Sequence, residues 1–564
     1  MPTRLWRLSP PAPQSFLAAN AHLPPLIAQL LYNRGLRDRA PIDAFFRADR
    51  SLAGDPFALP DMERAVGRVY QAILAGDAIA VFGDFDVDGV TASAVLTLGL
   101  RSLGAKVLPY IPSRVAEGHG LNQPALIYLL GAGARLLVTA DCGISSGPEV
   151  RLAAQAGLDT IIVDHHTPPQ DVPPALARIN PRQAGASYPY GDLASVGLAL
   201  KLIEALCVRL HRSDFESLYD LAALGTVADI APIVGENRYI VRRGLDLLNK
   251  LQRPGLQALA QIAGLRPGSI DAEAISFALG PRLNAPGRLN HAVSSFKLLT
   301  TDSPEEASHL AGELERQNQQ RRRLTEAVLG EARPQIEDLA SHPILVVSGE
   351  RFSPGVIGPV ASKLVEEFYR PAVVIEEGPE LARGSARSIP EFNVIAALKE
   401  CSDLFLRYGG HPQAGGFTTP IERLSELRAR LHASAERQLA GVDLTPSIAI
   451  DAAVPLRHLT PSVLPWLLKL APHGAGNPEP VFLASATQVT SARYLGTGEK
   501  HIRLKLKDGS VTWDAVGFNL GAWLPKLQPR MDVLYTVGVD SFRGQGLLQL
   551  RVLDLAASQG RPAP

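Results

Sequence analysis

The stretch that decides the fold is AIAVFGDFDVDG at residues 78–89, where a short apolar run ends in three aspartates spaced two residues apart. The run is typical of a buried β-strand, and Asp84, Asp86 and Asp88 follow directly after it. Acids at the end of a buried strand are costly to hold together unless a cation neutralises them. We therefore expect this stretch to combine a central strand with a metal site.

Two further apolar runs lead to residues of the same kind. LLVTADCG reaches Asp141, and TIIVDHH ends in Asp164, His165 and His166. Between residues 76 and 166, short β-rich runs alternate with helical stretches, which is the pattern of βαβ units in a parallel sheet. Because the carboxyl ends of parallel strands meet at one crevice, we expect these side chains to lie together. Such ligands suggest a two-metal phosphoester hydrolase.

The remainder of the chain adds a helical region, a second α/β block and a β-rich end. Residues 194–230 predict two helices, and the second carries Asp220 and Asp229, from which a further carboxylate can reach the crevice. The polar stretch from Pro304 to about residue 340 predicts a helix; thirty helical residues span about 45 Å, enough to bridge two domains. After about residue 445, short β-rich segments with Gly or Asp turns suggest a small barrel or sandwich.

Composition sets broad limits on the class of protein. The chain has 564 residues, 46% of them hydrophobic and 20% charged, as in an ordinary folded multidomain protein. Lys+Arg and Asp+Glu both number 56, so a polyanion must be held by local basic patches. The three cysteines form no CxxC pair, which argues against a zinc site or disulfide framework and favours a reducing cytoplasm. MPTRLWRLSPPAPQ lacks a signal-peptide core, and no apolar run is long enough for a bilayer, so we expect neither secretion nor membrane insertion.

Each motif also has a simpler interpretation. DFDVDG matches the start of a calcium loop, but its twelfth position, which needs a Glu, is Val95. The aspartates could instead be helix caps and turn residues, an interpretation that does not explain three acids after one strand. Cys142 beside Asp141 could be a nucleophile, but no base is positioned for it, and we expect a small buried residue.

Basic residues in glycine-rich or polar loops suggest phosphate recognition. Arg114, Arg282, Arg288 and Arg387 lie in such loops, and a guanidinium fork binds two phosphate oxygens at once. RYGGHPQAGGF holds His411 between glycine pairs, which suggests either a tight turn or a close approach to a ligand, and we favour the ligand.

Taken together, GDFDVDG, TADCG, DHH and LGTVADI resemble the four motifs of the DHH phosphoesterase superfamily, and RYGGHPQAGGF resembles the GGH motif of its associated domain. Within that superfamily, PRLNAPGRLN, GVIGPVASKLVE, GSARS and LAPHGAGNPEPVF resemble the RecJ family of single-stranded-DNA-specific 5′-to-3′ exonucleases. The resemblance covers about residues 60–555.

The resemblance implies an α/β multidomain fold: a parallel-sheet DHH domain, a long connecting helix, a second α/β domain with the GGH motif, and a β-rich OB-fold domain. The boundaries we predict are an N-terminal segment at 1–60, the DHH catalytic domain at 61–300, the connecting helix at 301–341, the DHH-associated domain at 342–440 and the OB-fold-like nucleic-acid-binding domain at 441–564.

The resemblance also implies roles for individual residues. Two divalent cations, Mn²⁺ or Mg²⁺, would be held by Asp84, Asp86, Asp88, Asp141, His165 and Asp229. His166 would face the scissile phosphate, and Asp164 would orient its neighbours. The 5′-terminal phosphate would be gripped by Arg114, Arg288, Ser385 and Arg387, with Arg282 as a further DNA contact and His411 against the strand. Lys500, His501, Arg503 and Lys505 would track the strand from the OB-fold.

The implied activity is hydrolysis of the 5′-terminal phosphodiester of single-stranded DNA by a metal-activated water, which releases 5′-mononucleotides in DNA repair and recombination. Implied protein partners are a single-strand-binding protein and a RecQ-type helicase, and a monomer would suffice.

The chain departs from the usual motifs at two places. Phe352 and Ser353 replace Trp-His before the GVIG segment, and His119 replaces Tyr in EGYG; both changes lie outside the metal motifs and concern details of strand contact. Two other functions remain open. A related DHH enzyme for oligoribonucleotides or cyclic dinucleotides would not need the long helix or the β-rich domain, and an inactive strand-binding scaffold would not need the intact acids.

Overall fold

The computed structural model describes residues 4–114, 116–336, 342–496, 498–539 and 548–558. The chain divides into two compact units, each assembled from several segments. Unit 1 consists of residues 1–6, 285–290 and 313–448. Unit 2 consists of residues 7–284, 291–312 and 449–564.

The first part of unit 2 is built on a five-stranded parallel sheet with the order β3-β2-β4-β5-β6. Its strands are β2 (Ala78–Gly83), β3 (Lys106–Tyr110), β4 (Ala134–Ala140), β5 (Asp159–Val163) and β6 (Ala177–Ile179). The predicted parallel sheet is confirmed, and the short β6 is an addition that the sequence did not indicate. The deciding strand β2 lies between β3 and β4, with nearly every residue buried.

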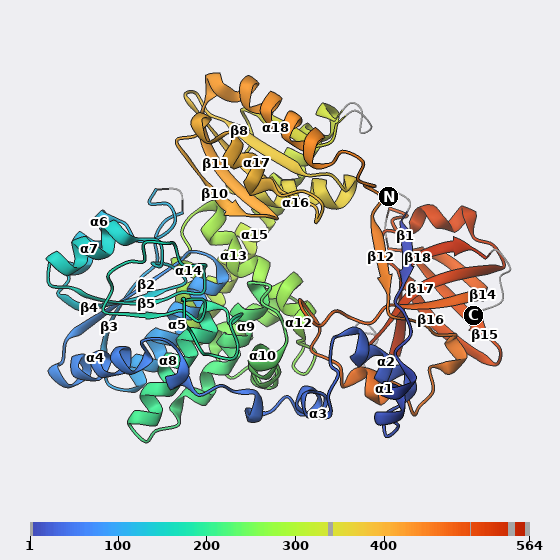
Figure 1. Cartoon of the computed structure of the whole chain (residues 1–564), viewed down its shortest axis with the longest axis horizontal. Coiled ribbons are helices and arrows are strands. Elements are labelled where there is room, and N and C mark those ends of the chain that lie inside the picture. The colour runs from blue at the N-terminus through green and yellow to red at the C-terminus, as the bar shows by residue number, and fades with distance from the viewer. Residues whose placement is uncertain (1–3, 115, 337–341, 497, 540–547, 559–564) are drawn as a thin grey trace. The chain divides into compact units, whose positions relative to one another are not determined.

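Helices cover both faces of this sheet, as Figure 1 shows at the blue and cyan end of the colour scale. One face is covered by α6 (Gln123–Gly131) and α7 (Gly147–Gln155), which share a hydrophobic core with Phe82 and Leu137 of the strands. The other face carries α4 (Met62–Ala75), α5 (Val87–Ser102) and α8 (Ser195–Arg209). Because both faces are covered, the carboxyl edge of the sheet is where polar side chains gather.

The helical region continues with α9 (Tyr219–Ala228), α10 (Gly235–Leu248), α11 (Pro254–Ile262), α12 (Ala272–Ala274), α13 (Gly280–Leu289) and α14 (Val293–Thr300). The two helices predicted within residues 194–230 are α8 and α9. Asp220 lies at the start of α9. Its side chain accepts a hydrogen bond from Arg253 at 2.6 Å, so its described partner is an arginine and not the acids that follow the strands. Asp229 follows the last residue of α9.

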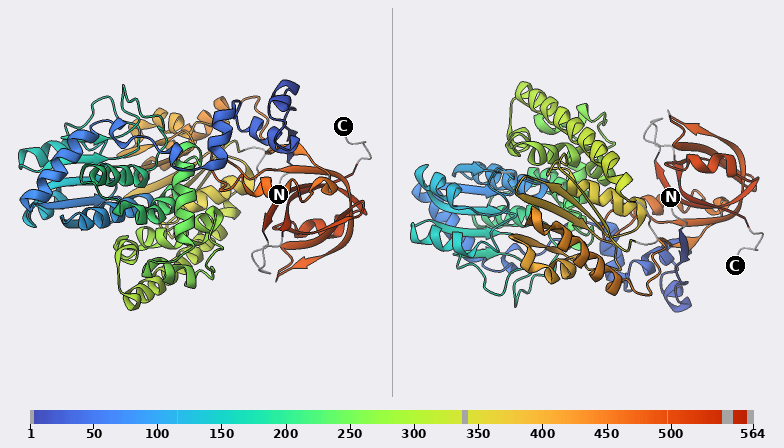
Figure 2. Two further views of the ribbon diagram at one scale, coloured as in Figure 1. Left: turned by 90° about the horizontal axis from the view of Figure 1, so that it is seen from below. Right: turned by 90° about the horizontal axis from the view of Figure 1, so that it is seen from above.

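The predicted β-rich end is a closed five-stranded barrel (Figure 2). It consists of β14 (Phe482–Leu495), β15 (His501–Asp508), β16 (Val511–Gly517), β18 (Leu548–Ala557) and β17 (Arg530–Val539), and pairing of β14 with β17 closes it. A bulge between Ala484 and Thr487 bends β14 so that it can pair with both β15 and β17. The even-numbered residues of β15, such as Ile502 and Leu504, fill the interior.

The N-terminal segment shares the hydrophobic core of this barrel. Its helices are α1 (Gln14–Ala19), α2 (Pro25–Asn33) and α3 (Arg39–Arg47). Leu30 and Ile42 are fully or almost fully buried in one cluster with Phe482 and Tyr535. Segments more than 400 residues apart thus form one core. The short strands β1 (Leu5–Leu8), β12 (Ser447–Ile450) and β13 (Ala452–Ala453) lie outside the closed barrel.

Unit 1 contains a mixed five-stranded sheet with the order β10-β11-β9-β8-β7. Its strands are β7 (Leu345–Gly349), β8 (Ala372–Glu377), β9 (Leu381–Arg387), β10 (Arg407–His411) and β11 (Ala414–Pro420), of which only β7 and β8 pair in parallel among those described. One face packs on α16 (Ile357–Phe368) and the other on α17 (Val394–Glu400) and α18 (Leu424–Gln438). This is the predicted second α/β domain.

The long helix α15 runs over Pro304–Ala332 and is followed by a 3-10 turn at Arg333–Gln335. It ends earlier than the predicted limit near residue 340, because Pro334 cannot continue the helical hydrogen bonds. The last part of the prediction, residues 337–341, lies outside the described residues. At about 1.5 Å per residue the helix is about 44 Å long, and it contributes residues to both units.

Among the described helices, none combines the length and apolar character needed to cross a membrane.

A buried ion pair fixes α8, whose first residues hold the candidate site described below. The ammonium of Lys201, with 1% of its side chain exposed, lies 2.7 Å from Glu204 and 3.0 Å from Glu236, and it donates a hydrogen bond to the Gly54 carbonyl. Glu236 also accepts a hydrogen bond from the Tyr188 hydroxyl. The network joins α8, α10 and the segment before α4.

We expect Lys201→Met to destabilise the protein by about 3–5 kcal/mol, because it leaves the buried Glu236 without its cation and Glu204 with only the exposed Arg50. Urea or thermal unfolding measures the loss. Arg209→Met, on the same helix but in an exposed ion pair with Glu63, is the control and should cost less than about 1 kcal/mol. Equal losses in the two variants would contradict this assignment.

Candidate metal centre and phosphate-binding pocket

The predicted ligands gather where the parallel strands end. Asp84 follows β2 directly, Asp141 follows β4, and Asp164 and His165 follow β5. The turn after β4 is sharp, because Asp141 has a left-handed backbone with φ of 67°. Short polar side chains adopt this conformation more readily than others. The carboxyl edge of the sheet therefore carries the cluster that the sequence predicted.

Three overlapping groups in this cluster could each hold a cation. Within each group the nearest ligand atoms all lie within 4.8 Å of one another. The groups are Asp84, Asp86 and Asp141; Asp88, His165 and Asp229; and Asp141, His165 and His166. All six residues predicted as metal ligands are thus brought together, with His166 at the margin.

His165 lies between two of the acids. Its Nε2 atom is 3.4 Å from Asp141 Oδ1 and its Nδ1 atom is 3.8 Å from Asp229 Oδ2. Burial, and then the neighbouring His166, lower the pKa of His165 to about 4. The imidazole is therefore neutral near neutral pH, which is the form that binds a metal.

The first turn of α8 holds two of the aspartates in place. The backbone N–H groups of Ser195 and Val196 donate to the two oxygens of Asp88, both at 2.8 Å. The Ser195 hydroxyl donates to Asp141 Oδ1 at 2.9 Å. Unpaired N–H groups at a helix start favour negative charge. Sequence reasoning missed Ser195 and Val196, because every residue except proline has a backbone N–H and the sequence does not show which one donates to a site. The only signal in the sequence was a serine at the start of a helix.

Asp164 contacts the backbone and His166 and belongs to none of the three groups. It accepts hydrogen bonds from Ile144 N at 3.0 Å, His166 N at 3.0 Å and His166 Nδ1 at 2.7 Å. Burial opposes ionisation of Asp164, but the His166 contacts outweigh it and lower the pKa of this carboxyl. The same hydrogen bond raises the pKa of His166. Asp164 thus lies where it can orient His166, and the orienting role that the resemblance implies stays a prediction.

The acids repel one another strongly in the absence of a cation. Burial, followed by neighbouring carboxylates, raises the pKa values of Asp84, Asp88 and Asp141 well above the usual range, and that of Asp229 to about 7. The buried Oδ1 atom of Asp84 has no hydrogen-bond partner among the described residues. An unpartnered carboxylate oxygen beside other carboxylates is what a divalent cation satisfies. The residues present therefore fit a metal centre.

Capping and metal binding are compatible at the start of α5. Asp86 is the N-cap of α5, and its side chain accepts a hydrogen bond from Gly89 N at 3.0 Å. A Cβ atom at Gly89 would lie 2.6 Å from Asp84 Cβ, so only glycine allows this close approach. The capping interpretation is thus correct for Asp86 but leaves Asp84 and Asp88 unexplained.

Cys142 is buried, and its environment raises the pKa of the thiol well above its ordinary value, first through burial and then through Asp84. A protonated thiol is a poor nucleophile. The structure agrees with a small buried residue here.

Several basic or aromatic side chains border the cluster. The guanidinium of Arg114 lies over the Phe85 ring, 5.0 Å from its centre. His119, the departure from the usual motif, places Nε2 3.6 Å from Asp84 Oδ2 and its ring edge against His166. Arg182, which sequence reasoning missed, follows the buried Asn180, whose side chain accepts from Arg182 N and donates to the His166 carbonyl.

In unit 1, Ser385 and Arg387 lie at the start of α16. They occupy the end of β9, where Arg387 Nη1 donates to Ser385 Oγ at 3.2 Å. A Cβ atom at Gly358 would lie 3.2 Å from Ser385 Oγ and 3.3 Å from Arg387 Nη2. A serine hydroxyl and a guanidinium beside a helix N-terminus make a suitable phosphate site.

Arg288 approaches the same helix start through its backbone. A Cβ atom at Gly355 would lie 2.1 Å from the Arg288 carbonyl oxygen, so Gly355 allows α13 to lie against the segment that leads into α16. The backbone of Arg288 therefore lies near the helix start that Ser385 and Arg387 border, and all three residues belong to unit 1. Arg114 belongs to unit 2.

The GGH motif forms a tight hairpin. His411 ends β10 and pairs with Ala414, the first residue of β11, and it is exposed. Gly410 has φ of 146°, and a Cβ atom there would lie 2.3 Å from the Ala414 carbonyl oxygen. Turn geometry alone thus requires Gly410, and a strand contact by His411 stays a prediction.

The remaining predicted DNA contacts are distributed over unit 2. The barrel strand β15 directs His501, Arg503, Lys505 and Lys507 outward, since Ile502, Leu504 and Leu506 are buried. Arg503 lies 3.8 Å from Asp514, and Lys500 precedes the strand. Arg282 in α13 donates to the Ala278 carbonyl at 2.8 Å.

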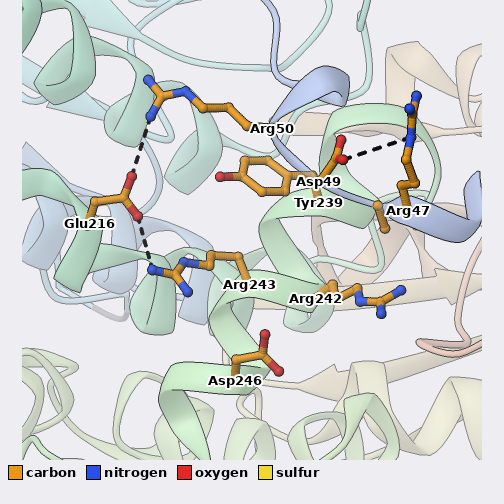
Figure 3. Close-up of a pocket in the computed structure, with 9 residues that line it drawn as sticks. Arg47, Asp49, Arg50, Glu216, Tyr239, Arg242, Arg243 and Asp246 are labelled. Carbon is orange, nitrogen blue, oxygen red and sulfur yellow. Dashed lines mark hydrogen bonds and ion pairs between the residues drawn. The ribbon is translucent and has the colours of Figure 1, made fainter. Parts of the chain in front are cut away.

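A cavity of about 380 Å³ lies apart from these residues, between the N-terminal segment and α10 (Figure 3). Its arginines are mostly engaged: Arg50 and Arg243 both pair with Glu216, and Arg47 pairs with Asp49. None of the predicted site residues lines it.

Family models match three parts of the chain. The DHH family N-terminal domain matches residues 78–226, the DHHA1 domain residues 341–437 and the RecJ OB domain residues 450–554.

Full-length relatives and a solved structure match as well. The single-stranded-DNA-specific exonuclease RecJ of Bacillus subtilis is 36% identical over 96% of this chain and 69% of its own length. RecJ of Thermus thermophilus is 34% identical over 100% of this chain and 80% of its own length. The crystal structure of RecJ in complex with Mn²⁺ from Thermus thermophilus has a TM-score of 0.84 at 32% identity, and the match covers 99% of this chain and 81% of that one.

We expect Mn²⁺ to raise the melting temperature more at about pH 8 than at about pH 5.5. Without a cation, raised carboxyl pKa values contribute stability that is present below the unfolded-state pKa and lost as pH rises, through about 7 for Asp229. Protons also compete with the cation at low pH. Thermal unfolding in Mn²⁺ and in chelator at both pH values measures the difference, and a larger shift at the acid pH would contradict the metal centre.

Proposed function

Since this chain belongs to the RecJ family, we propose that it is a metal-dependent 5′-to-3′ exonuclease that degrades single-stranded DNA from a 5′-phosphorylated end and releases 5′-mononucleotides. The observation that carries the proposal is the cluster of five aspartates and two histidines at the edge of the parallel sheet. It occurs in a chain that matches Mn²⁺-bound RecJ over nearly its whole length.

In this proposal Asp84, Asp86, Asp88, Asp141, His165 and Asp229 hold two divalent cations, Mn²⁺ or Mg²⁺. When bound, such cations stabilise charge on phosphoryl oxygens and lower the pKa of a water. Asp164 holds Nδ1 of His166, and the raised pKa of His166 favours a proton on Nε2, which is then available to a phosphate oxygen. The first turn of α8 keeps Asp88 and Asp141 oriented throughout.

The direction of digestion would follow from an anchor for the terminal phosphate. Arg387, Ser385 and the N-terminus of α16 supply a guanidinium, a hydroxyl and backbone N–H groups, which together suit a 5′-phosphate. The basic outer face of β15 suits the backbone of a single strand, without base-specific contacts. The roles of Arg114, Arg282, Arg288, His411, Lys500 and Arg503 belong to the same proposal.

The partners and location that we propose follow from this substrate. Single-stranded DNA is the main partner, and a single-strand-binding protein and a RecQ-type helicase are proposed as proteins that present it. The three cysteines are all free and buried, which agrees with the cytoplasm as the proposed location.

The function is tested by digestion of a long single strand that carries a 3′ label. Strands with a 5′-phosphate, strands with a 5′-hydroxyl and duplexes are compared in Mn²⁺ and in chelator. We expect metal-dependent shortening of the 5′-phosphorylated single strand. Activity only on short oligonucleotides or cyclic dinucleotides would favour a related phosphodiesterase, and inertness toward every substrate would favour the scaffold.

We expect Asp141→Asn to lower kcat by more than about 100-fold while strand affinity changes little, because Asp141 contributes to two of the three ligand groups. Single-turnover digestion and fluorescence anisotropy separate the two effects. The matched control is Asp159→Asn, which changes an aspartate on strand β5 that pairs with Arg68 instead. Full activity of Asp141→Asn across a Mn²⁺ titration would refute the ligand set.

We expect Arg387→Ala to reduce the preference for a 5′-phosphate over a 5′-hydroxyl by about 10-fold or more, the value of one charge-assisted hydrogen bond. The kcat/KM ratio for the two ends measures this preference. Arg383→Ala, four residues earlier on the same strand, is the control. An unchanged ratio for Arg387→Ala would remove the phosphate anchor from the proposal.

A further inference from the structure

The segment LAPHGAGNPEPVF at residues 470–482, which leads into the barrel strand β14, has no part in the proposed function so far. It contacts the loop Ile230–Gly235, which directly follows Asp229 at the end of α9. The Ile233 N–H donates to the Ala475 carbonyl at 2.7 Å. Gly474 faces Ile233 so closely that a Cβ atom there would lie 2.5 Å from Ile233 Cδ1. Both segments belong to unit 2.

Arg238, in the first turns of α10, stabilises the segment that makes this contact. Its side chain is fully buried and stacks on Phe45 at 3.8 Å from the ring centre. Its nitrogens donate five hydrogen bonds, all to backbone carbonyls: Phe45, Lys469, Leu470, Ala471 and Pro472. Four of these carbonyls follow the short helix α19 (Leu464–Leu468), where carbonyl groups lack helical partners. A buried guanidinium bonded only to carbonyls is costly unless all its N–H groups are satisfied, as they are here.

Asn477 shapes the other end of the segment. Its side chain is fully buried, and its amide donates to the carbonyls of Leu470 and Pro472 at 2.9 and 2.8 Å. Its carbonyl oxygen accepts a hydrogen bond from Arg34 Nε at 2.9 Å. Arg238 and Asn477 thus share two acceptors, which makes the turn between residues 470 and 477 rigid.

The loop that this turn contacts contains a strained residue. Ile230 has φ of 60°, a left-handed conformation that β-branched side chains rarely adopt, and its side chain is 74% exposed, so no burial repays the strain. Such strain persists only where surrounding contacts enforce it. On one side Asn237 donates to the carbonyls of Pro232 and Asp192. On the other side Ala475 accepts from Ile233.

We propose that Arg238 and Asn477 are positioning residues: they hold the turn at 470–477 against the loop Ile230–Gly235 and thereby keep Asp229 placed for metal binding. The inference rests on the proposed function, since it concerns the same metal centre. It makes the segment that leads into the barrel part of the support of that centre. Loss of the contact lets the loop relax from its strained conformation and moves Asp229 away from Asp88 and His165.

The test inserts one methyl group at the contact. Gly474→Ala places Cβ against Ile233 Cδ1, the end of a flexible side chain, so the variant can fold with a displaced loop. Ile233→Val removes that Cδ1 atom. We expect Gly474→Ala to raise the Kd for Mn²⁺ about tenfold, Ile233→Val to leave it nearly unchanged, and the double variant to restore most of the affinity. Calorimetric titration with Mn²⁺, at a temperature well below the melting point of each variant, measures the Kd values.

Arg238→Lys is a second variant, because it keeps the charge but loses the planar fork, and it should weaken Mn²⁺ binding at least as much. Arg242→Met is its control, since Arg242 lies one turn further along α10 and donates to the Phe46 carbonyl instead.

The outcomes separate the inference from the proposed function. Wild-type Mn²⁺ affinity in Gly474→Ala and Arg238→Lys, with only a lowered melting temperature, would overturn the positioning role and leave the metal centre standing. Failure of the wild-type protein to bind Mn²⁺ would overturn the proposed function itself. Weakened binding that Ile233→Val reverses would support the inference, because every titration is made well below the melting point of its variant, where a general loss of stability does not change the Kd.

Discussion

Repulsion among buried carboxylates at the carboxyl edge of the parallel sheet is the constraint on which the rest of the structure depends. Asp84, Asp88 and Asp141 are all nearly fully buried, and after burial itself neighbouring carboxylates raise the pKa of each. The protein offsets part of this cost with N–H groups at the start of α8. No hydrogen bond within the described chain reaches Asp84 Oδ1. The remaining charge needs divalent cations, so the site is complete only as a metal complex.

The parts of the fold that could be predicted from sequence are those in which local pattern and site coincide. The strand that ends at Gly83 is short and apolar, and aspartates follow it at once. β4 and β5 are also short and largely apolar, and Asp141 and Asp164 follow them directly. Period-two alternation revealed β15 equally well, since Ile502 and Leu504 point inward and Arg503 outward. In each case the relevant information lies within about ten residues.

What could not be predicted depends on contacts between distant segments. The cluster that joins Leu30 and Ile42 to Phe482 has no local signature, because α2 and α3 are ordinary amphipathic helices on their own. Arg238 has the appearance of a surface charge in the sequence GENR, and its acceptors lie more than 190 residues away in either direction. Ser195 acts through its backbone as well as its hydroxyl, and a backbone donor is the same in every residue except proline.

The order of the ligands along the chain has a consequence for folding. Asp84 and Asp229 are 145 positions apart, and the loop after Asp229 is held by Ala475, far beyond both. The strain at Ile230 opposes the functional loop conformation until that contact forms. A partly folded chain with a formed parallel sheet but an undocked barrel therefore lacks one support of the metal centre. A nuclease gains from this arrangement, because hydrolytic competence then depends on the same docking that brings the strand-binding barrel into the structure.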